Sequence, residues 1–80
     1  MDIESAVRLR IKDLCNTHNL TINALSVQAG MPRSTLKNIV YGTSKNTGVV
    51  TIQLICDALN ISISEFFDDD IFRNVEQIKD

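Results

Sequence analysis

The sequence predicts an all-helical fold of a single compact domain, and three observations support this prediction. Apolar residues recur at intervals of three and four along most of the chain, which is the spacing of one helix face. Residues that favour the beginnings and ends of helices separate these segments. No segment alternates apolar and polar residues as a strand does, and Val49-Val50 is too short to form one. A length of 80 residues is enough for one domain.

The first helix is predicted over residues 4–18. Its single apolar stripe consists of Val7, Ile11, Leu14, Cys15 and His18. The charged residues Arg8, Arg10, Lys12 and Asp13 fall off that stripe.

The second and third helices are predicted to be short and closely spaced. Thr21 is a good N-cap for a helix over residues 21–29, and Gly30 can adopt the left-handed conformation that ends it. Pro32 suits the first turn of a third helix over residues 32–41, because the first helical turn needs no backbone donor there. Gly42 ends this helix.

Two further helices and a tail complete the prediction. Residues 42–48 form a polar loop, and Thr51 begins a fourth helix that closes at Asn60. Ser62 and Glu65 have the spacing of a capping box and predict a short fifth helix. We divide the chain into a domain over residues 1–70 and a helical or irregular tail over residues 71–80.

The net charge of −2 and the isoelectric point near 5.2 are unusual for a protein that binds nucleic acid. The distribution of charge matters more than its sum. No acidic residue lies between Asp13 and Asp57, whereas Arg33, Lys37 and Lys45 all lie there. This middle segment could form a basic face or an ordinary solvated surface, and composition alone leaves both open.

Several functional classes lack their signals in this sequence. No apolar run is long enough to span a membrane, and the first residues do not resemble a signal peptide, so we expect a cytoplasmic protein. Cys15 and Cys56 are expected to be reduced core thiols, and their spacing matches no zinc motif. We find no nucleophile–base pair or phosphate-binding glycine loop, and therefore expect neither an enzyme nor a cofactor.

The region around Gly30 meets the physical requirements of a helix-turn-helix. Two helices that pack closely need small residues where they meet, which Ser26 and Ala29 provide. Gly30 supplies the tight turn, and Met31 is the apolar residue expected to anchor that turn in the core.

Residues 20–39, followed by Gly42, resemble the phage repressor and Cro family, also described as XRE-like or lambda-repressor-like. The family pattern places a leucine and a small residue in the second helix, glycine at the turn, and Ser-Thr-Leu in the third helix. Residues 51–67 are similar to the family's fourth and fifth helices. The resemblance implies a five-helix lambda-repressor-like domain that regulates transcription, with repression as the expected outcome and the helix over residues 32–41 in the major groove.

The resemblance also implies roles for individual residues. Arg33 and Ser34 correspond to positions that contact base edges, and Asn38 lies one turn further on the same face and is a third candidate base contact. The expected phosphate contacts are Asn23, Thr35, Lys37, Tyr41, Thr43, Ser44, Lys45 and Asn46. Ser34 could equally be a helix-start residue, Tyr41 could pack against the fourth helix, and Asn46 could belong to a plain loop.

The sequence departs from the family pattern at three places. Ala24 stands where an acidic residue or glutamine would form a capping box, and Val40 stands where a polar or acidic residue is common. No proline follows the loop after the third helix. These departures leave the predicted fold intact and make the loop's phosphate contacts less defined.

The expected partners are a palindromic double-stranded DNA operator and a second copy of the chain. The candidate dimer-interface residues are Phe67, Ile71, Phe72, Val75 and Ile78. An alternative is a protein-interaction module of the same fold, such as an antitoxin or an anti-repressor, which the acidic isoelectric point favours slightly.

Overall fold

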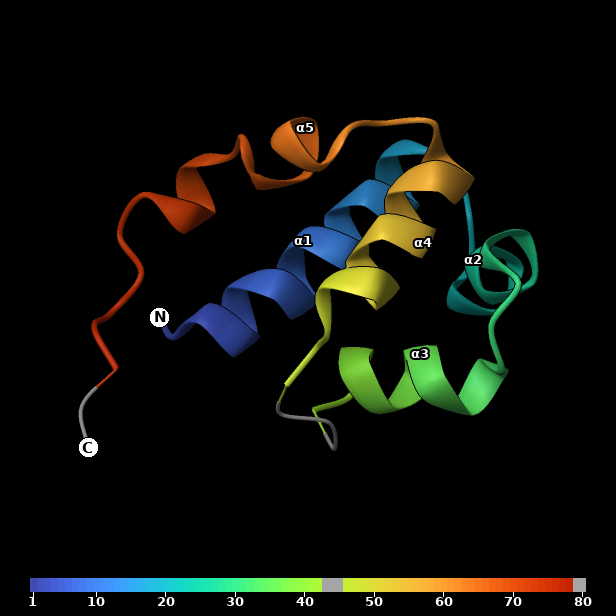
Figure 1. Cartoon of the computed structure of the whole chain (residues 1–80), viewed down its shortest axis with the longest axis horizontal. Helices are drawn as coiled ribbons and strands as arrows, with labels where there is room; N and C mark the ends of the chain where they lie inside the picture. Colours follow the sequence, from blue (N-terminus) through green and yellow to red (C-terminus); the bar gives the residue numbers. More distant parts are fainter. Residues whose placement is uncertain (43–45, 79–80) are drawn as a thin grey trace.

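The computed structural model describes residues 1–42 and 46–78 and shows an all-helical domain (Figure 1). The elements in chain order are α1 (Ile3–Thr17), α2 (Ile22–Ala29), α3 (Arg33–Val40), α4 (Val49–Leu59), α5 (Ile63–Phe67) and the short 3₁₀-helix η1 (Asp70–Phe72). The described residues contain no strand. The predicted all-α fold with five α-helices is therefore confirmed.

Helix α1 packs against α2, α3 and η1. Asp2 caps it by accepting a hydrogen bond from the Ser5 amide at 2.8 Å, and hydrogen bonding from Ser5 lowers the pKa of the Asp2 carboxyl. The predicted stripe is buried from Val7 to Cys15, but His18 is exposed. Its Nδ1 lies 2.8 Å from the Leu14 carbonyl oxygen. His18 therefore belongs to the exposed end of the helix and not to the core.

Helix α4 begins at Val49 and not at Thr51 as predicted. Gly48 is its N-cap, and the Ile52 amide donates to the Gly48 carbonyl at 3.1 Å. Val49 and Val50 occupy the first turn with 77% and 71% of their surface exposed. The prediction of Thr51 as the first residue was wrong by two residues, because this helix starts without a side-chain cap and its first turn is exposed.

One hydrophobic core joins all five α-helices. Its fully buried members include Ile11, Leu25, Leu36, Ile55 and Phe66, one from each helix. Cys15 and Cys56 are buried free thiols, and burial raises the pKa of both. No helix among the described residues combines the length and apolar character needed to cross a membrane.

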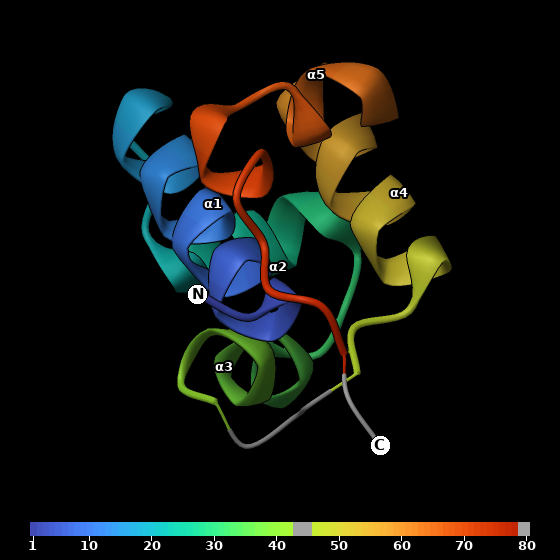
Figure 2. The ribbon, with the colours of Figure 1, turned by 90° about the vertical axis from the view of Figure 1, so that its left-hand side faces the viewer.

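The tail, expected to be helical or irregular, is mostly irregular with one short helical turn. After α5 it makes the single 3₁₀ turn η1 and then continues without regular structure through Ile78. Phe72 packs against the core, with its ring centroid 4.9 Å from that of Phe67 and 6.2 Å from that of Phe66. The tail then lies beside the start of α1, where Glu76 and Met1 share a backbone hydrogen bond and an ion pair of 3.0 Å (Figure 2).

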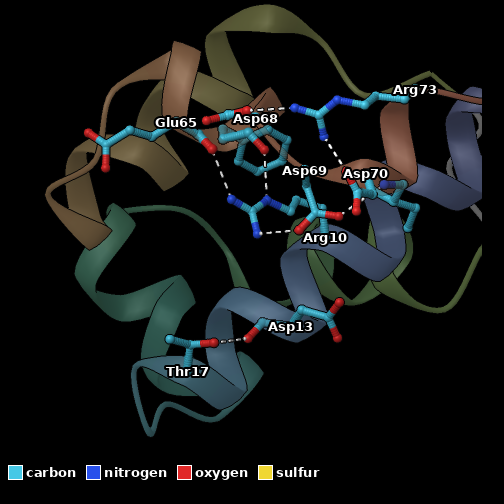
Figure 3. Close-up of polar contacts among 10 residues, drawn as sticks. Arg10, Asp13, Thr17, Glu65, Asp68, Asp69, Asp70 and Arg73 are labelled. Carbon is cyan, nitrogen blue, oxygen red and sulfur yellow. Dashed lines mark hydrogen bonds and ion pairs between the residues drawn. The ribbon is translucent and has the colours of Figure 1, made fainter.

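Arg10 fastens α5 and η1 to α1 (Figure 3). Its guanidinium donates to the carbonyl oxygens of Glu65 and Phe66 at 2.8 and 2.7 Å, and to the Asp69 carboxylate at 3.2 Å. The last carbonyls of a helix lack the usual intrahelical donor. The Phe66 carbonyl accepts from Arg10 instead, and the Glu65 carbonyl accepts from Arg10 as well as from the Asp68 amide at 3.2 Å. Only 15% of its side chain is exposed.

We predict that Arg10→Met lowers the free energy of unfolding by about 2 kcal/mol, because it leaves carbonyl oxygens at a partly buried site without their charged donor. Urea denaturation followed by circular dichroism measures this loss. Arg73→Met is the matched control, since Arg73 pairs with Asp68 and Asp70 on a surface where 58% of its side chain is exposed. Its expected loss is below about 0.5 kcal/mol. Equal losses for the two variants would contradict a special role of Arg10.

Candidate nucleic-acid interface

Helix α2 is built to lie close to its neighbours. The Thr21 hydroxyl caps it by accepting from the Ala24 amide at 3.0 Å, as its sequence position predicts. Ser26 is fully buried, and its hydroxyl donates to the Ile22 carbonyl at 3.0 Å within the same helix. The Ser26 hydroxyl therefore has its hydrogen-bond partner within α2. The small size of serine permits close packing of α2 against its neighbours.

The turn between α2 and α3 depends on the conformation of Gly30. Its φ of +67° and ψ of 31° lie in the left-handed region, which residues with a Cβ adopt at a cost. The Met31 amide donates to the Ser26 carbonyl at 3.1 Å, which closes the end of α2. Met31 itself is half-buried and packs against the core. The tight glycine turn with an apolar anchor is therefore present as predicted.

Helix α3 separates an anchoring face from an exposed face. Leu36, Ile39 and Val40 are buried. The exposed residues of this helix and its C-cap are Arg33, Ser34, Lys37, Asn38 and Tyr41. The buried residues hold the helix against the domain, so Arg33, Ser34 and Lys37 are left exposed to solvent. Figure 1 shows α3 along one edge of the molecule, where nothing else among the drawn helices covers it.

Val40, which departs from the family pattern, is part of the core. It is 3% exposed and, like Cys15 of α1, lines a hollow between α1 and α3. A charged residue at position 40 would need a partner in this apolar contact. The departure therefore has a local structural reason and leaves the exposed face of α3 unchanged.

A second hollow, of about 190 Å³, brings α3 together with the segment that leads into α4. Thr35, Asn38, Asn46 and Thr51 contribute polar groups to its lining. Thr35, Asn38 and Asn46 were proposed from the sequence, whereas Thr51 was not. Thr51 was missed because its position in the first turn of α4, facing α3, depends on tertiary packing.

The other sequence-derived candidates fall into two groups. Asn23 is exposed in the first turn of α2. Thr43, Ser44 and Lys45 lie outside the described residues, so the structure gives no account of these three candidates.

The charged groups are unevenly distributed in space. Among the described residues, the ion pairs join Arg10 to Asp69, Arg73 to Asp68 and Asp70, and the N-terminus to Glu76. These pairs involve neither Arg33 nor Lys37. The acidic segment around α5 and η1 lies on the opposite side of the molecule from α3 (Figure 1). One acidic residue approaches the interface, since Glu4 lines a small hollow together with Asn46 and Thr47.

The comparison with known proteins agrees with this geometry. Residues 10–70 match the family model of the Cro/C1-type helix-turn-helix DNA-binding domain. The chain belongs to this family. The crystal structure of the prophage Lp1 protein 11 is similar to it, with 33% sequence identity and a TM-score of 0.81 over 94% of this chain and 100% of that one. No curated protein sequence matches the chain.

Membership of the Cro/C1-type family confirms the resemblance found in the sequence and identifies the chain as a DNA-binding regulator. The matched segment contains all of α2 to α5 and the second half of α1. It ends at residue 70, and the packing of Phe72 on the core continues beyond it. The division of the chain at residue 70 stays a prediction.

We predict that Gly30→Ala lowers the free energy of unfolding by about 1 kcal/mol. No heavy atom outside the immediate chain lies within 4 Å of a Cβ built at Gly30, so the loss reflects left-handed backbone strain and not a clash. Gly30→Asn is the control, because asparagine tolerates this conformation better and should lose about half as much. Urea denaturation of both variants measures the difference. An alanine variant as stable as the parent would show that the turn does not need glycine.

Proposed function

We propose that the protein is a sequence-specific transcriptional repressor that inserts α3 into the major groove of its operator. The observation that carries this proposal is the two-sided character of α3, with Leu36, Ile39 and Val40 buried and its polar side chains exposed at one edge of the domain. A major groove about 12 Å wide admits a helix that stands clear of its domain in this way. Binding over a promoter would exclude RNA polymerase by occupancy.

Three side chains of α3 are proposed to recognise bases. Arg33 begins the helix, and its guanidinium can donate two hydrogen bonds to guanine. Asn38 can pair in the same bidentate manner with adenine, while Ser34 can donate to or accept from several bases. Each bidentate pair contributes about 1–3 kcal/mol of discrimination against the wrong base.

A second set of residues is proposed to bind the phosphates on either side of the groove. Lys37 and Tyr41 extend the exposed face of α3, Thr35 and Asn46 line the smaller hollow, and Asn23 lies at the start of α2. Such contacts fix the position of the domain without recognising sequence. From the sequence we also propose Thr43, Ser44 and Lys45 as phosphate contacts.

We further propose that the protein acts as a homodimer on a palindromic operator, with half-sites about one helical turn apart. The proposed contact is the tail. Ile78 is 83% exposed and Phe67 38% exposed, whereas Ile71, Phe72 and Val75 are half-buried. Because Phe72 packs on the core of its own chain, we assign most of the contact to Phe67 and Ile78.

Selection from random double-stranded DNA tests sequence-specific binding. We predict an enriched palindromic motif, and we expect Arg33→Ala to relax the preference at one position of each half-site, because it removes a base contact. Lys37→Ala is the matched comparison and should weaken binding to all selected sequences similarly. Failure to enrich any motif would contradict the proposal and would favour a protein-interaction module of the same fold.

Sedimentation equilibrium tests the dimer. We predict that the parent chain associates at tens of micromolar and that Ile78→Glu shifts it towards monomer, because the substitution places a charge in an apolar contact. Gln77→Glu is the matched control, since it adds a charge at the neighbouring exposed position. A parent chain that stays monomeric at these concentrations would contradict association through the tail.

A further inference from the structure

A hollow of the domain lies where α1, the start of α2 and the end of α3 meet. Its volume is about 370 Å³. The lining residues are Lys12, Cys15, Asn16, Leu20, Thr21, Ile22, Val40 and Tyr41. Of these, only Tyr41 was a candidate contact on sequence grounds. The hollow therefore joins a residue of the proposed interface to a part of α1 that had no assigned role.

This hollow and the smaller one lie on opposite flanks of α3. Successive residues of a helix are rotated by about 100°, so Val40 and Thr35 point to opposite sides, roughly 140° apart. Val40 lines the hollow beside α1, and Thr35 lines the hollow beside α4. Figure 2 shows α3 almost end-on, with the α1–α2 connection on one side and the chain that enters α4 on the other. A helix in the major groove has one DNA backbone strand on each of these flanks.

The lining of the larger hollow combines two chemistries. Lys12, Asn16 and Tyr41 supply a cation, an amide and a phenol, and each of the three side chains is exposed. Leu20 and Ile22 are half-buried apolar residues, and Cys15 is buried. A DNA backbone presents the same alternation, because charged phosphates are separated by deoxyribose rings with apolar C–H faces.

Lys12 is the cation of α1 that is best placed to receive a phosphate. None of the ion pairs among the described residues involves it. Its neighbour one turn earlier, Arg8, instead donates to the Ser5 hydroxyl at 2.9 Å, and its charge helps to lower the pKa of the Asp2 carboxyl. The Arg8 guanidinium also lies beside Gly42, which places this side of α1 along the end of α3.

We propose that α1 is part of the DNA interface and that Lys12 binds a backbone phosphate on the flank of α3 beside this hollow. Tyr41 and Asn16 donate to the same phosphate or the next, and the apolar floor accepts the adjoining deoxyribose. The inference rests on the proposed insertion of α3 into the major groove, and it extends that interface to a helix outside the helix-turn-helix.

The salt dependence of DNA binding tests this inference with the full chain. A labelled duplex carrying the selected site is titrated at 50 and 200 mM salt, and fluorescence anisotropy gives Kd at each. One phosphate contact contributes about 0.9 to the slope of log K against log salt, so a fourfold rise in salt weakens binding by about 3.5-fold per contact. We expect Lys12→Gln to reduce the ratio of the two Kd values by about 3.5-fold for each bound chain. Lys12→Arg should keep the parent ratio.

Arg73→Gln is the control for net charge, because it removes the same charge at the acidic end of the molecule. It should leave the ratio of Kd values unchanged. Lys12→Met keeps the apolar stem of the side chain and should reproduce the result of Lys12→Gln, with thermal unfolding confirming that each variant is folded.

Two results would overturn this inference but leave the proposed function standing. These are a parent-like ratio in folded Lys12→Gln and Lys12→Met, or an equal reduction in Arg73→Gln. Absence of salt-dependent DNA binding by the parent chain would instead overturn the proposed function, and the inference with it.

Discussion

The burial of one face of α3 is the constraint on which the rest of the molecule depends. Leu36, Ile39 and Val40 fill a core to which every other α-helix contributes, so the direction of the opposite face is set by packing and not by the polar residues themselves. Removal of this apolar surface from water fixes the helix rotationally. The Gly30 turn then sets where the helix begins. Side chains that meet DNA are thereby oriented before any contact is made, which limits the conformational entropy lost on binding.

The local features could be predicted from the sequence because each depends on neighbouring residues. Thr21, Gly30 and the Ser62–Glu65 capping box have physical effects that act within one helical turn, and all three are observed. The start of α4 could not be predicted in this way, since Gly48 caps it without a side chain. The position of Lys12 beside a hollow at the end of α3 could not be predicted either. A lysine outside the apolar stripe of a helix gives the same sequence pattern whether it faces open solvent or the end of another helix.

The charge pattern was only partly visible in the sequence. The acidic residues of the last third are concentrated near α5 and η1, where Arg10 and Arg73 pair with Asp68, Asp69 and Asp70. Two of the protein's eight basic residues thus form ion pairs with these acids, away from α3. Glu4 shows the opposite effect, because folding brings an acid from outside the predicted basic segment close to Asn46. The net charge of the chain is therefore a poor guide to the charge of this interface, because most acidic residues lie away from it and Glu4 lies near it.

The pairing of Met1 with Glu76 depends on the charge of the first residue. The ammonium group in that pair exists only while Met1 is the first residue of the chain. Any residue fused ahead of it, such as those of an affinity tag, converts the ammonium to an uncharged amide and introduces bulk beside the tail. A sample whose first residue is Met1 is therefore appropriate wherever the position of residues 75–78 is under study.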